Sequence, residues 1–303
     1  MLLKSLRVQN HKSITDIKLD FVEPVTGIFG TAGCGKSAIL ECVGIIRDWI
    51  GLGWTPELFY EPCILCDKDS GTSIELTVED TETNVYRYGL TYVSDGLLNE
   101  WLVINDEVIY ENKTPEKHPK QTVLSMGYED VSKMLKKLLL DRIVYATDRI
   151  FCVYTPAMLN YIVNREQPKD MFLRLSDVVE KLDVGIKRIE FPEDEKSEKI
   201  MCVHRIDGKE YRKEITREPY GIQKILSFEL LSEFAKKHQF VLIFDDIDIK
   251  FPESVLLGYL ESLKDSGCQV VFSATNSGLM DGIDSIILEN NKGTRQSIER
   301  ERK

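Results

Sequence analysis

The sequence predicts an α/β fold that is organised around a glycine-rich loop. An octapeptide of the form GxxxxGK[ST], at residues 30–37, stands between an apolar strand pattern and a helical pattern. From residue 223 onward, helical and strand patterns alternate, which is typical of a parallel sheet covered by helices. The first 110 residues instead alternate apolar and polar side chains, as antiparallel strands do. We therefore predict a mixed or parallel sheet, an N-terminal antiparallel β-subdomain and a helical insert.

Residues 1–110 are expected to form an N-terminal lobe that holds the glycine-rich loop and the β-subdomain. Asn105 and Asp106 separate two apolar runs and predict a hairpin turn. A helix is expected over residues 37–46, and strands over residues 3–8, 17–21, 25–29, 73–78, 85–92, 101–104 and 107–110.

Residues 111–200 are expected to form the helical insert, and residues 201–303 a C-terminal lobe. In the insert we expect loops over 112–121 and 192–199, and helices over 131–140 and 171–182. In the C-terminal lobe we expect helices over 223–235 and 253–263, and strands over 240–244, 269–272 and 285–288. The strand over 240–244 is entirely apolar, which indicates burial on both faces. The charged residues 295–303 are expected to be a solvated tail.

The composition is that of a soluble globular protein with a full core. The chain has 303 residues, of which 43% are hydrophobic and 29% are charged. Its net charge of −11 argues against a surface covered by nucleic acid. No apolar run approaches the ~20 residues that span a membrane, and the N-terminus alternates like a strand rather than a signal peptide. We therefore expect a cytoplasmic protein with no membrane association.

Seven cysteines are scattered along the chain, mostly within apolar stretches. This distribution is typical of small core residues in a reducing compartment. Cys63 and Cys66 form a CxxC pair, but a structural zinc ion would need a second pair. We therefore expect neither a metal site nor a redox role for these two residues.

The glycine-rich loop predicts a site for the phosphates of a nucleotide. Glycine allows the backbone to fold tightly, so that successive N–H groups point at phosphate oxygens. Lys36 can reach the β- and γ-phosphates, and the Ser37 hydroxyl can ligate Mg²⁺. The helix that follows would direct its N-terminus at the same anion. The residues expected to bind the nucleotide here are Gly30, Thr31, Ala32, Gly33, Cys34, Gly35, Lys36, Ser37 and Ala38.

Two acidic residues, Asp245 and Asp246, follow the apolar strand over 240–244. Enzymes with this loop need one carboxylate to hold the Mg²⁺ shell and a second to orient the attacking water. We assign Asp245 to the metal and Asp246 to the water. We expect their strand to lie next to the strand over 25–29, because ligands sit at the carboxyl ends of strands in open α/β sheets.

With both halves of the site in place, the chain resembles the ABC-type ATPase heads of the RecF, SMC and OLD group. It is most similar to the stand-alone "AAA family ATPases" of abortive-infection and phage-defence operons. The opening segment over residues 6–14 is similar to the N-terminal strand and turn of that group, and residues 85–102 and 182–189 are similar to segments of its defence-type members.

The resemblance implies that two heads meet head-to-tail, so that ATP on one loop is capped by a signature sequence of the other head. Residues 217–224 match that signature, and Gly221 is implied to contact the partner's nucleotide. Asp248 falls in the dimer-contacting D-loop, and residues 272–281 match the switch strand, where Thr275 takes the place of the residue that senses the γ-phosphate.

Three residues depart from the group's pattern. Pro219 replaces the signature serine and has neither a hydroxyl nor an N–H to donate. Asp246 replaces a glutamate, and Thr275 replaces a histidine. Loss of one contact to a transferring phosphoryl group commonly lowers the rate by ~10²–10³. Because the loop and Asp245 are unaltered, nucleotide binding is expected to survive better than turnover.

The resemblance implies a slowly hydrolysing ATPase that uses ATP and Mg²⁺, with Lys36, Asp246 and Thr275 acting on the phosphoryl group. It would be a switch or scaffold, as a homodimer or with a related ATPase, and it would control a separate nuclease or toxin in anti-phage defence. Nucleic acid would be contacted through that partner. The chain ends soon after its last predicted strand, so we expect the effector to be another chain.

Three alternatives remain open from the sequence. One is a RecF-like DNA repair or recombination ATPase, against which the acidic charge balance counts. Another is a structural subunit that binds nucleotide without hydrolysing it, which the altered Pro219, Asp246 and Thr275 favour. A small-molecule kinase is the weakest, because such kinases lack a long β-rich insert after the loop.

Overall fold

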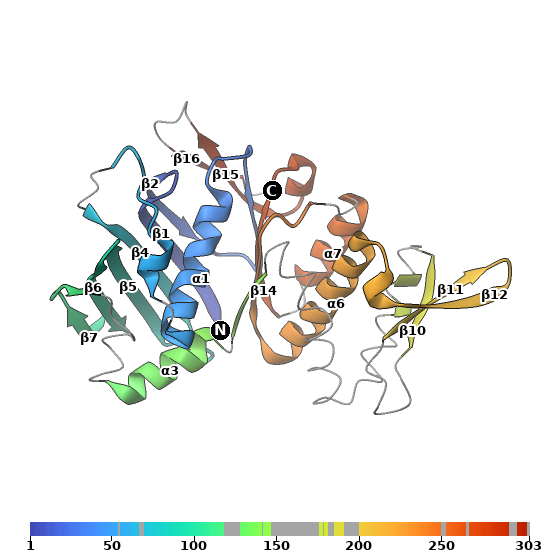
Figure 1. Cartoon of the computed structure of the whole chain (residues 1–303), viewed down its shortest axis with the longest axis horizontal. Helices are drawn as coiled ribbons and strands as arrows, with labels where there is room; N and C mark the ends of the chain where they lie inside the picture. Colours follow the sequence, from blue (N-terminus) through green and yellow to red (C-terminus); the bar gives the residue numbers. More distant parts are fainter. Residues whose placement is uncertain are drawn as a thin grey trace.

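A computed structural model describes most of the chain, and Figure 1 shows its arrangement. The described residues are 1–53, 55–66, 70–117, 128–140, 142–146, 176–177, 179–180, 185–190, 200–249, 253–264, 267–290 and 296–301. Two large sheets face each other across a layer of helices, a second helical layer covers the far face of one sheet, and a small sheet lies at one side (Figure 1).

The N-terminal residues form the predicted antiparallel sheet. Its strands lie in the order β2 (Ile14–Asp20), β1 (Leu2–His11), β4 (Thr72–Glu79), β5 (Val85–Val93), β6 (Gly96–Ile104) and β7 (Glu107–Asn112), and β8 (Glu116–Lys117) also pairs with β6. The hairpin between β6 and β7 turns at Asn105 and Asp106, whose φ angles of 48° and 65° are those of a tight hairpin turn. This predicted turn is therefore confirmed. β8 falls inside the predicted loop over 112–121, of which residues 118–121 lie outside the described residues.

The second large sheet carries the glycine-rich loop. Its order is β16 (Gln296–Glu301), β15 (Asp284–Asn290), β3 (Val25–Phe29), β14 (Gln269–Ala274), β13 (Val241–Phe244) and β9 (Ile143–Ala146). All neighbours are parallel except β15 and β16.

Three expectations about this sheet were wrong or incomplete. β13 does not lie next to β3, because β14 pairs with both of them and separates them. β15 is not the last strand, because β16, inside the expected solvated tail, pairs with it. β9 was not predicted, because its segment, residues 143–146, is short, although it is rich in β-forming residues.

Helices cover both faces of the parallel sheet (Figure 1). The helices α1 (Lys36–Leu52) and α3 (Glu129–Leu140) lie between the two large sheets, whereas α6 (Tyr220–His238) and α7 (Glu253–Lys264) cover the opposite face. In β13, Val241 and Ile243 join the core around α1, and Leu242 and Phe244 join the core around α6 and α7. Burial on both faces is the reason that this strand is apolar at every position.

A small antiparallel sheet was not predicted. It consists of β10 (Ile186–Glu190), β11 (Met201–Ile206) and β12 (Lys209–Glu214), and its core includes Leu226 of α6. Asp207 and Gly208 make the β11–β12 turn with φ angles of 50° and 78°. The Asp-Gly pair was a readable hairpin signal.

The division of the chain at residues 110 and 200 remains a prediction. β10 and β11 lie on opposite sides of residue 200 and pair with each other. Within the predicted helix over 171–182, the described residues 176–177 and 179–180 are helical. The predicted loop over 192–199 and Cys152 lie outside the described residues. None of the described helices is long and apolar enough to cross a membrane.

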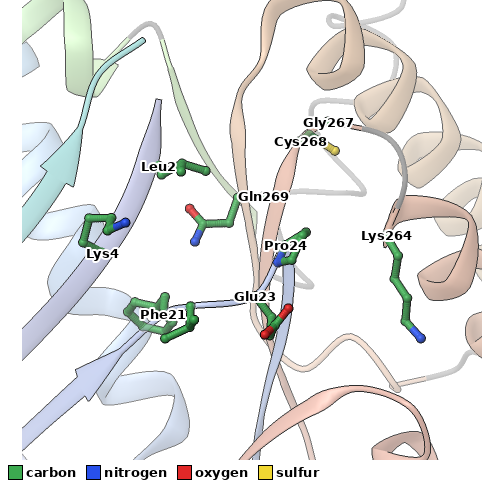
Figure 2. A pocket seen from close by; sticks show the side chains of 10 residues that line it. Leu2, Lys4, Phe21, Glu23, Pro24, Lys264, Gly267, Cys268 and Gln269 are labelled. Atoms are coloured by element: carbon green, nitrogen blue, oxygen red, sulfur yellow. The ribbon is translucent and has the colours of Figure 1, made fainter. Parts of the chain in front are cut away.

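One side chain joins the two large sheets at the edge where β3 and β14 begin. The Gln269 amide accepts a hydrogen bond from the Leu3 N–H (2.6 Å) and donates one to the Leu3 carbonyl oxygen (2.8 Å). Gln269 also lines a cavity of about 180 Å³, together with Pro24, Lys264 and seven other residues (Figure 2). Because the glycine-rich loop follows the other end of β3, this cavity is separate from the loop.

Candidate functional site

The glycine-rich loop adopts backbone angles that favour glycine. Gly30, Gly33 and Gly35 have φ angles of 149°, 82° and 104°. Gly35 is the residue that caps α1, and neither a side-chain cap nor an acidic residue in the first turn occupies the start of this helix. The start of α1 therefore carries no acidic side chain of its own, and its N–H groups and dipole favour a bound anion.

Gly30 also lies against the neighbouring strand β15. A Cβ atom at this position would be 2.4 Å from the carbonyl oxygen of Leu288 and 2.6 Å from the Sγ of Cys34. The loop is thus packed closely on the sheet at Gly30, whereas a Cβ atom at Gly33 would have no neighbour within 4 Å. One end of the loop is held by the fold, and its tip at Thr31, Ala32 and Gly33 is exposed.

Lys36 directs its charge into the loop. Its Nζ donates to the carbonyl oxygens of Gly30 (2.8 Å) and Thr31 (3.2 Å), and the residue is only 5% exposed. A phosphate group is a stronger acceptor for an ammonium group than a neutral carbonyl. The predicted role of Lys36 is therefore compatible with its position.

The two acidic residues at the end of β13 are connected by Ser273 of β14. The Ser273 hydroxyl donates to Asp245 Oδ1 (2.6 Å) and accepts the backbone N–H of Asp246 (2.7 Å). Ser273 and Asp245 are both buried. No sequence pattern indicates a role for Ser273, because its contacts depend on β14 lying directly beside β13.

Asp246 is held in an unusual environment. Its φ of 50° is left-handed, a conformation that aspartate tolerates better than most residues. Burial raises the pKa of its carboxyl group, and the negative charge of Asp245 raises this pKa further, whereas the positive charge of Lys36 lowers it. The glycine-rich loop and the acidic pair follow the same ends of the parallel strands β3 and β13, which only β14 separates.

Lys224 connects α6 to the turn that carries Asp246. Its Nζ donates to the carbonyl oxygens of Asp246 (3.3 Å) and Ile249 (2.9 Å) and lies 5.7 Å from the centre of the Phe228 ring. The residue is almost completely buried. The signature-like segment, which leads into α6, is thus attached through Lys224 to the turn that carries the acidic pair.

Thr275 and Asp248 contact each other. Asp248 Oδ2 accepts hydrogen bonds from the Thr275 N–H (2.9 Å), the Thr275 hydroxyl (3.0 Å) and the Asn276 N–H (2.8 Å). The turn after β13 is therefore attached to the turn after β14. The proposed role of Thr275 toward a γ-phosphate remains a prediction, and in this structure its hydroxyl donates to Asp248.

Comparisons with known proteins bear on the whole chain. A family model described as an AAA domain matches residues 5–46, from β1 into α1, and includes the glycine-rich loop. No curated protein matches the chain. Among solved structures, the SMC head domain from Thermotoga maritima matches with a TM-score of 0.58 and 15% identity, over 100% of each chain.

Two further structures agree with this match. An SMC head bound to the C-winged helix domain of ScpA has a TM-score of 0.66 and 13% identity, covering 99% of this chain and 97% of the other. The Smc head with an extended coiled coil, bound to the C-terminal domain of ScpA derived from Pyrococcus furiosus, has a TM-score of 0.58 and 12% identity, covering 98% and 96%. The chain has the fold of an SMC head.

Within this SMC-head fold, Gly221 belongs to α6, whereas the glycine-rich loop leads into α1. α6 begins after Pro219, next to the small sheet, and lies on the opposite face of the parallel sheet from α1 (Figure 1). The preceding Glu218 is buried, and it accepts hydrogen bonds from His204 Nε2 (2.7 Å) and Lys213 Nζ (3.4 Å). The fold thus places the helix that contains Gly221 and the helix that follows the loop on opposite faces of the parallel sheet.

The side-chain oxygen atoms of Ser37 and Asp245 are of the type that Mg²⁺ binds. Ser37 is exposed at the start of α1, and Asp245 supplies a carboxylate that Ser273 orients. Among the described residues, no cluster of three or more histidine, cysteine, aspartate or glutamate side chains could hold a metal by itself. This arrangement fits Mg²⁺, which usually takes one or two protein ligands together with phosphate oxygens and water. When bound, Mg²⁺ would neutralise charge on the phosphates.

Proposed function

We propose that this chain binds ATP together with Mg²⁺ through residues 30–38 and Asp245. The observation that carries the proposal is the meeting of three groups at one edge of the sheet. The Lys36 ammonium lies within a loop of positive-φ glycines, the first turn of α1 carries no acidic side chain, and Ser273 orients Asp245. A polyphosphate with a divalent cation complements these groups in charge and in donor type.

Binding of a fluorescent ATP analogue, with and without Mg²⁺, tests this proposal. We expect Mg²⁺-dependent binding by the wild type and at least a tenfold weaker affinity for Lys36→Ala. Lys113→Ala, at a lysine that is 73% exposed and distant in sequence from the loop, is the matched control and should bind normally. Equal binding by wild type and Lys36→Ala would overturn the assignment of the site.

We further propose that nucleotide controls assembly, so that the chain is a switch or scaffold for a separate effector. The resemblance noted in the sequence suggests a nuclease or toxin in anti-phage defence. Two features support assembly: the helix that contains Gly221 covers the opposite face of the parallel sheet from the helix that follows the loop, and two similar SMC heads have been solved with a bound domain of another protein, ScpA. A head-to-tail homodimer, or a pair with a related ATPase, would bring Gly221 of one chain to the loop of the other.

Sedimentation of the protein with a non-hydrolysable ATP analogue tests assembly. We expect a nucleotide-dependent increase in mass that Gly221→Arg abolishes while nucleotide binding is retained. Gly258→Arg, at an exposed glycine of α7 with open space around it, is the control and should still assemble. Assembly by Gly221→Arg at the wild-type nucleotide concentration would contradict this interface.

A second candidate is a subunit that binds ATP but hydrolyses it slowly or not at all. Pro219 has no N–H at the start of α6, and the Thr275 hydroxyl already donates to Asp248. Steady-state phosphate release distinguishes the two candidates. Release no faster than that of Lys36→Ala, alone and with a partner, favours the non-hydrolysing subunit. Salt-dependent DNA binding by the isolated chain would instead favour RecF-like action.

A further inference from the structure

Cys63 and Cys66 lie at the two ends of a tight, exposed turn. The Cys66 N–H donates to the Cys63 carbonyl oxygen (3.0 Å), which closes a four-residue turn. Such turns keep their end Cα atoms less than about 7 Å apart, and disulfides span Cα distances of about 4.4–6.8 Å. Ile64 and Leu65, at the tip, are 92% and 51% exposed. The backbone thus brings the two cysteines into the range of a disulfide, which the sequence pattern alone did not lead us to expect.

The two thiol groups also face each other. Burial raises the pKa of the Cys66 thiol, and the Cys63 thiol, to which it is hydrogen-bonded, raises this pKa further. Both cysteines are free thiols in this structure. Cys66 is partly exposed, whereas Cys63 is buried, and the Cys63 N–H donates to Asn10 Oδ1 (2.8 Å). One thiol is therefore open to a reagent from solvent, and the second is held behind it.

We propose that Cys63 and Cys66 form a reversible dithiol–disulfide site for two-electron oxidants of the peroxide class. In the first step the Cys66 thiolate attacks hydrogen peroxide: an S–O bond forms, the O–O bond breaks, and the departing hydroxide takes a proton to become water. In the second step the Cys63 sulfur attacks the Cys66 sulfenic acid: the S–S bond forms, the S–O bond breaks, and a second water leaves. The two thiols lose two electrons and two protons, and peroxide is reduced to two waters.

The turn is attached to the lobe that carries α1. The Lys12 N–H donates to the Glu61 carbonyl oxygen (2.6 Å), and the Lys12 Nζ pairs with Glu41 of α1 (2.5 Å). Asn10, which holds Cys63, also donates from its side chain to the Gly71 carbonyl oxygen (2.8 Å). A disulfide would therefore stiffen a turn fastened to the β1–β2 connection and, through Lys12, to α1. The proposal does not depend on nucleotide binding.

Four further cysteines within the described residues provide internal controls. Cys34, Cys42, Cys202 and Cys268 are buried at separate places in the fold. Cys42 is fully buried, its thiol donates to the Ala38 carbonyl oxygen (3.2 Å), and burial raises its pKa. A fully buried thiol is shielded from an oxidant in solvent, whereas Cys66 is partly exposed. Among the cysteines that the structure describes, oxidation is therefore expected to begin at the turn.

The experiment treats the reduced full-length chain with hydrogen peroxide, alkylates the remaining thiols, and maps peptides by mass spectrometry without reduction. We expect the peptide that contains residues 63–66 to lose the mass of two hydrogens, to escape alkylation, and to recover both thiols with dithiothreitol. Cys66→Ser and Cys63→Ala should each abolish this product, whereas Cys42→Ser should retain it.

Three results would overturn the proposal: alkylation of both Cys63 and Cys66 after peroxide treatment, irreversible oxidation of Cys66 alone, or a disulfide between two chains. A circular dichroism spectrum of each variant shows whether it is folded. If one variant fails to fold, the other variant and the wild-type peptide map still decide the outcome.

Discussion

Ser273 hydrogen-bonds Asp245 across two neighbouring parallel strands, from Oγ to Oδ1 at 2.6 Å. The same hydroxyl accepts the N–H of Asp246. The acidic pair is thus held by a side chain of β14 that belongs neither to the glycine-rich loop nor to the pair itself. Since β14 also pairs with β3, Ser273 lies on the strand that joins the two halves of the candidate site.

Ser273→Ala should weaken the Mg²⁺-dependent part of nucleotide binding. A hydrogen bond to a charged group contributes about 1.5–3 kcal/mol, so the Mg²⁺ concentration for half-maximal binding of the ATP analogue should rise about tenfold or more. Ser232→Ala removes an equally buried hydroxyl, which donates to the Phe228 carbonyl oxygen of α6. This control can lower the stability, but its Mg²⁺ dependence should match the wild type. An unchanged Mg²⁺ dependence in Ser273→Ala would count against the orienting role.

Asp246→Asn should stabilise the nucleotide-free protein near pH 7, and this advantage should disappear in acid. Burial, followed by the charge of Asp245, raises the pKa of Asp246, so its ionised form is less stable in the folded than in the unfolded chain. The protonated form carries no such penalty, so the difference should vanish below the ordinary aspartate pKa of about 3.9. Asparagine also tolerates the left-handed φ at this position. Thermal unfolding of both proteins from pH 7 to pH 3.5 measures the difference; a pH-independent gap contradicts the expected cause.

Gly30→Ala should destabilise the protein more than Gly33→Ala. Both residues have a positive φ, so both substitutions introduce backbone strain of about 1–2 kcal/mol. Only at Gly30 does the added methyl group meet a backbone atom, 2.4 Å from the Leu288 carbonyl oxygen, and such overpacking costs about 1–3 kcal/mol more. Urea unfolding of the two variants measures the difference. Equal losses of unfolding free energy in the two variants would contradict this prediction, because they would mean that β15 shifts away from the added methyl group without destabilising the protein.

Gln269→Ala should lower the free energy of unfolding by at least about 2 kcal/mol, because two buried backbone groups of Leu3 would each lose a partner worth about 1–3 kcal/mol. Gln9→Ala is the matched control, because it removes an exposed side-chain hydrogen bond to Asp16. Exposed substitutions of this kind change stability by about 0.5 kcal/mol or less. Chemical denaturation followed by intrinsic fluorescence compares the free energies of unfolding of the two variants. A loss of unfolding free energy no larger than that of Gln9→Ala would contradict this prediction, because it would mean that water pairs with the Leu3 backbone groups in place of the Gln269 amide.

Local patterns were sufficient for many of the elements. The glycine-rich loop, the helix after it, and the hairpin at Asn105 and Asp106 depend on a few adjacent residues whose backbone angles or spacing identify them. The strand over 240–244 was predicted for the same reason, because burial on both faces requires apolar residues at every position. The small sheet could have been predicted from Asp207 and Gly208, since an Asp-Gly pair between strand-forming residues is a hairpin signal.

The arrangement of these elements depends on contacts between segments that are far apart in the sequence. That the chain would carry a phosphate-binding type of loop and an acidic pair at a strand end was determined by the sequence alone, because each is a contiguous motif with its own backbone requirements. Only the tertiary structure decided that β14 separates their strands, that Ser273 connects Asp245 to Asp246, and that α6, which contains Gly221, covers the opposite sheet face from α1. The physical reason is that strand order and side-chain contacts between distant segments depend on which apolar faces pack together, and a local pattern shows that a face is apolar without showing its neighbour.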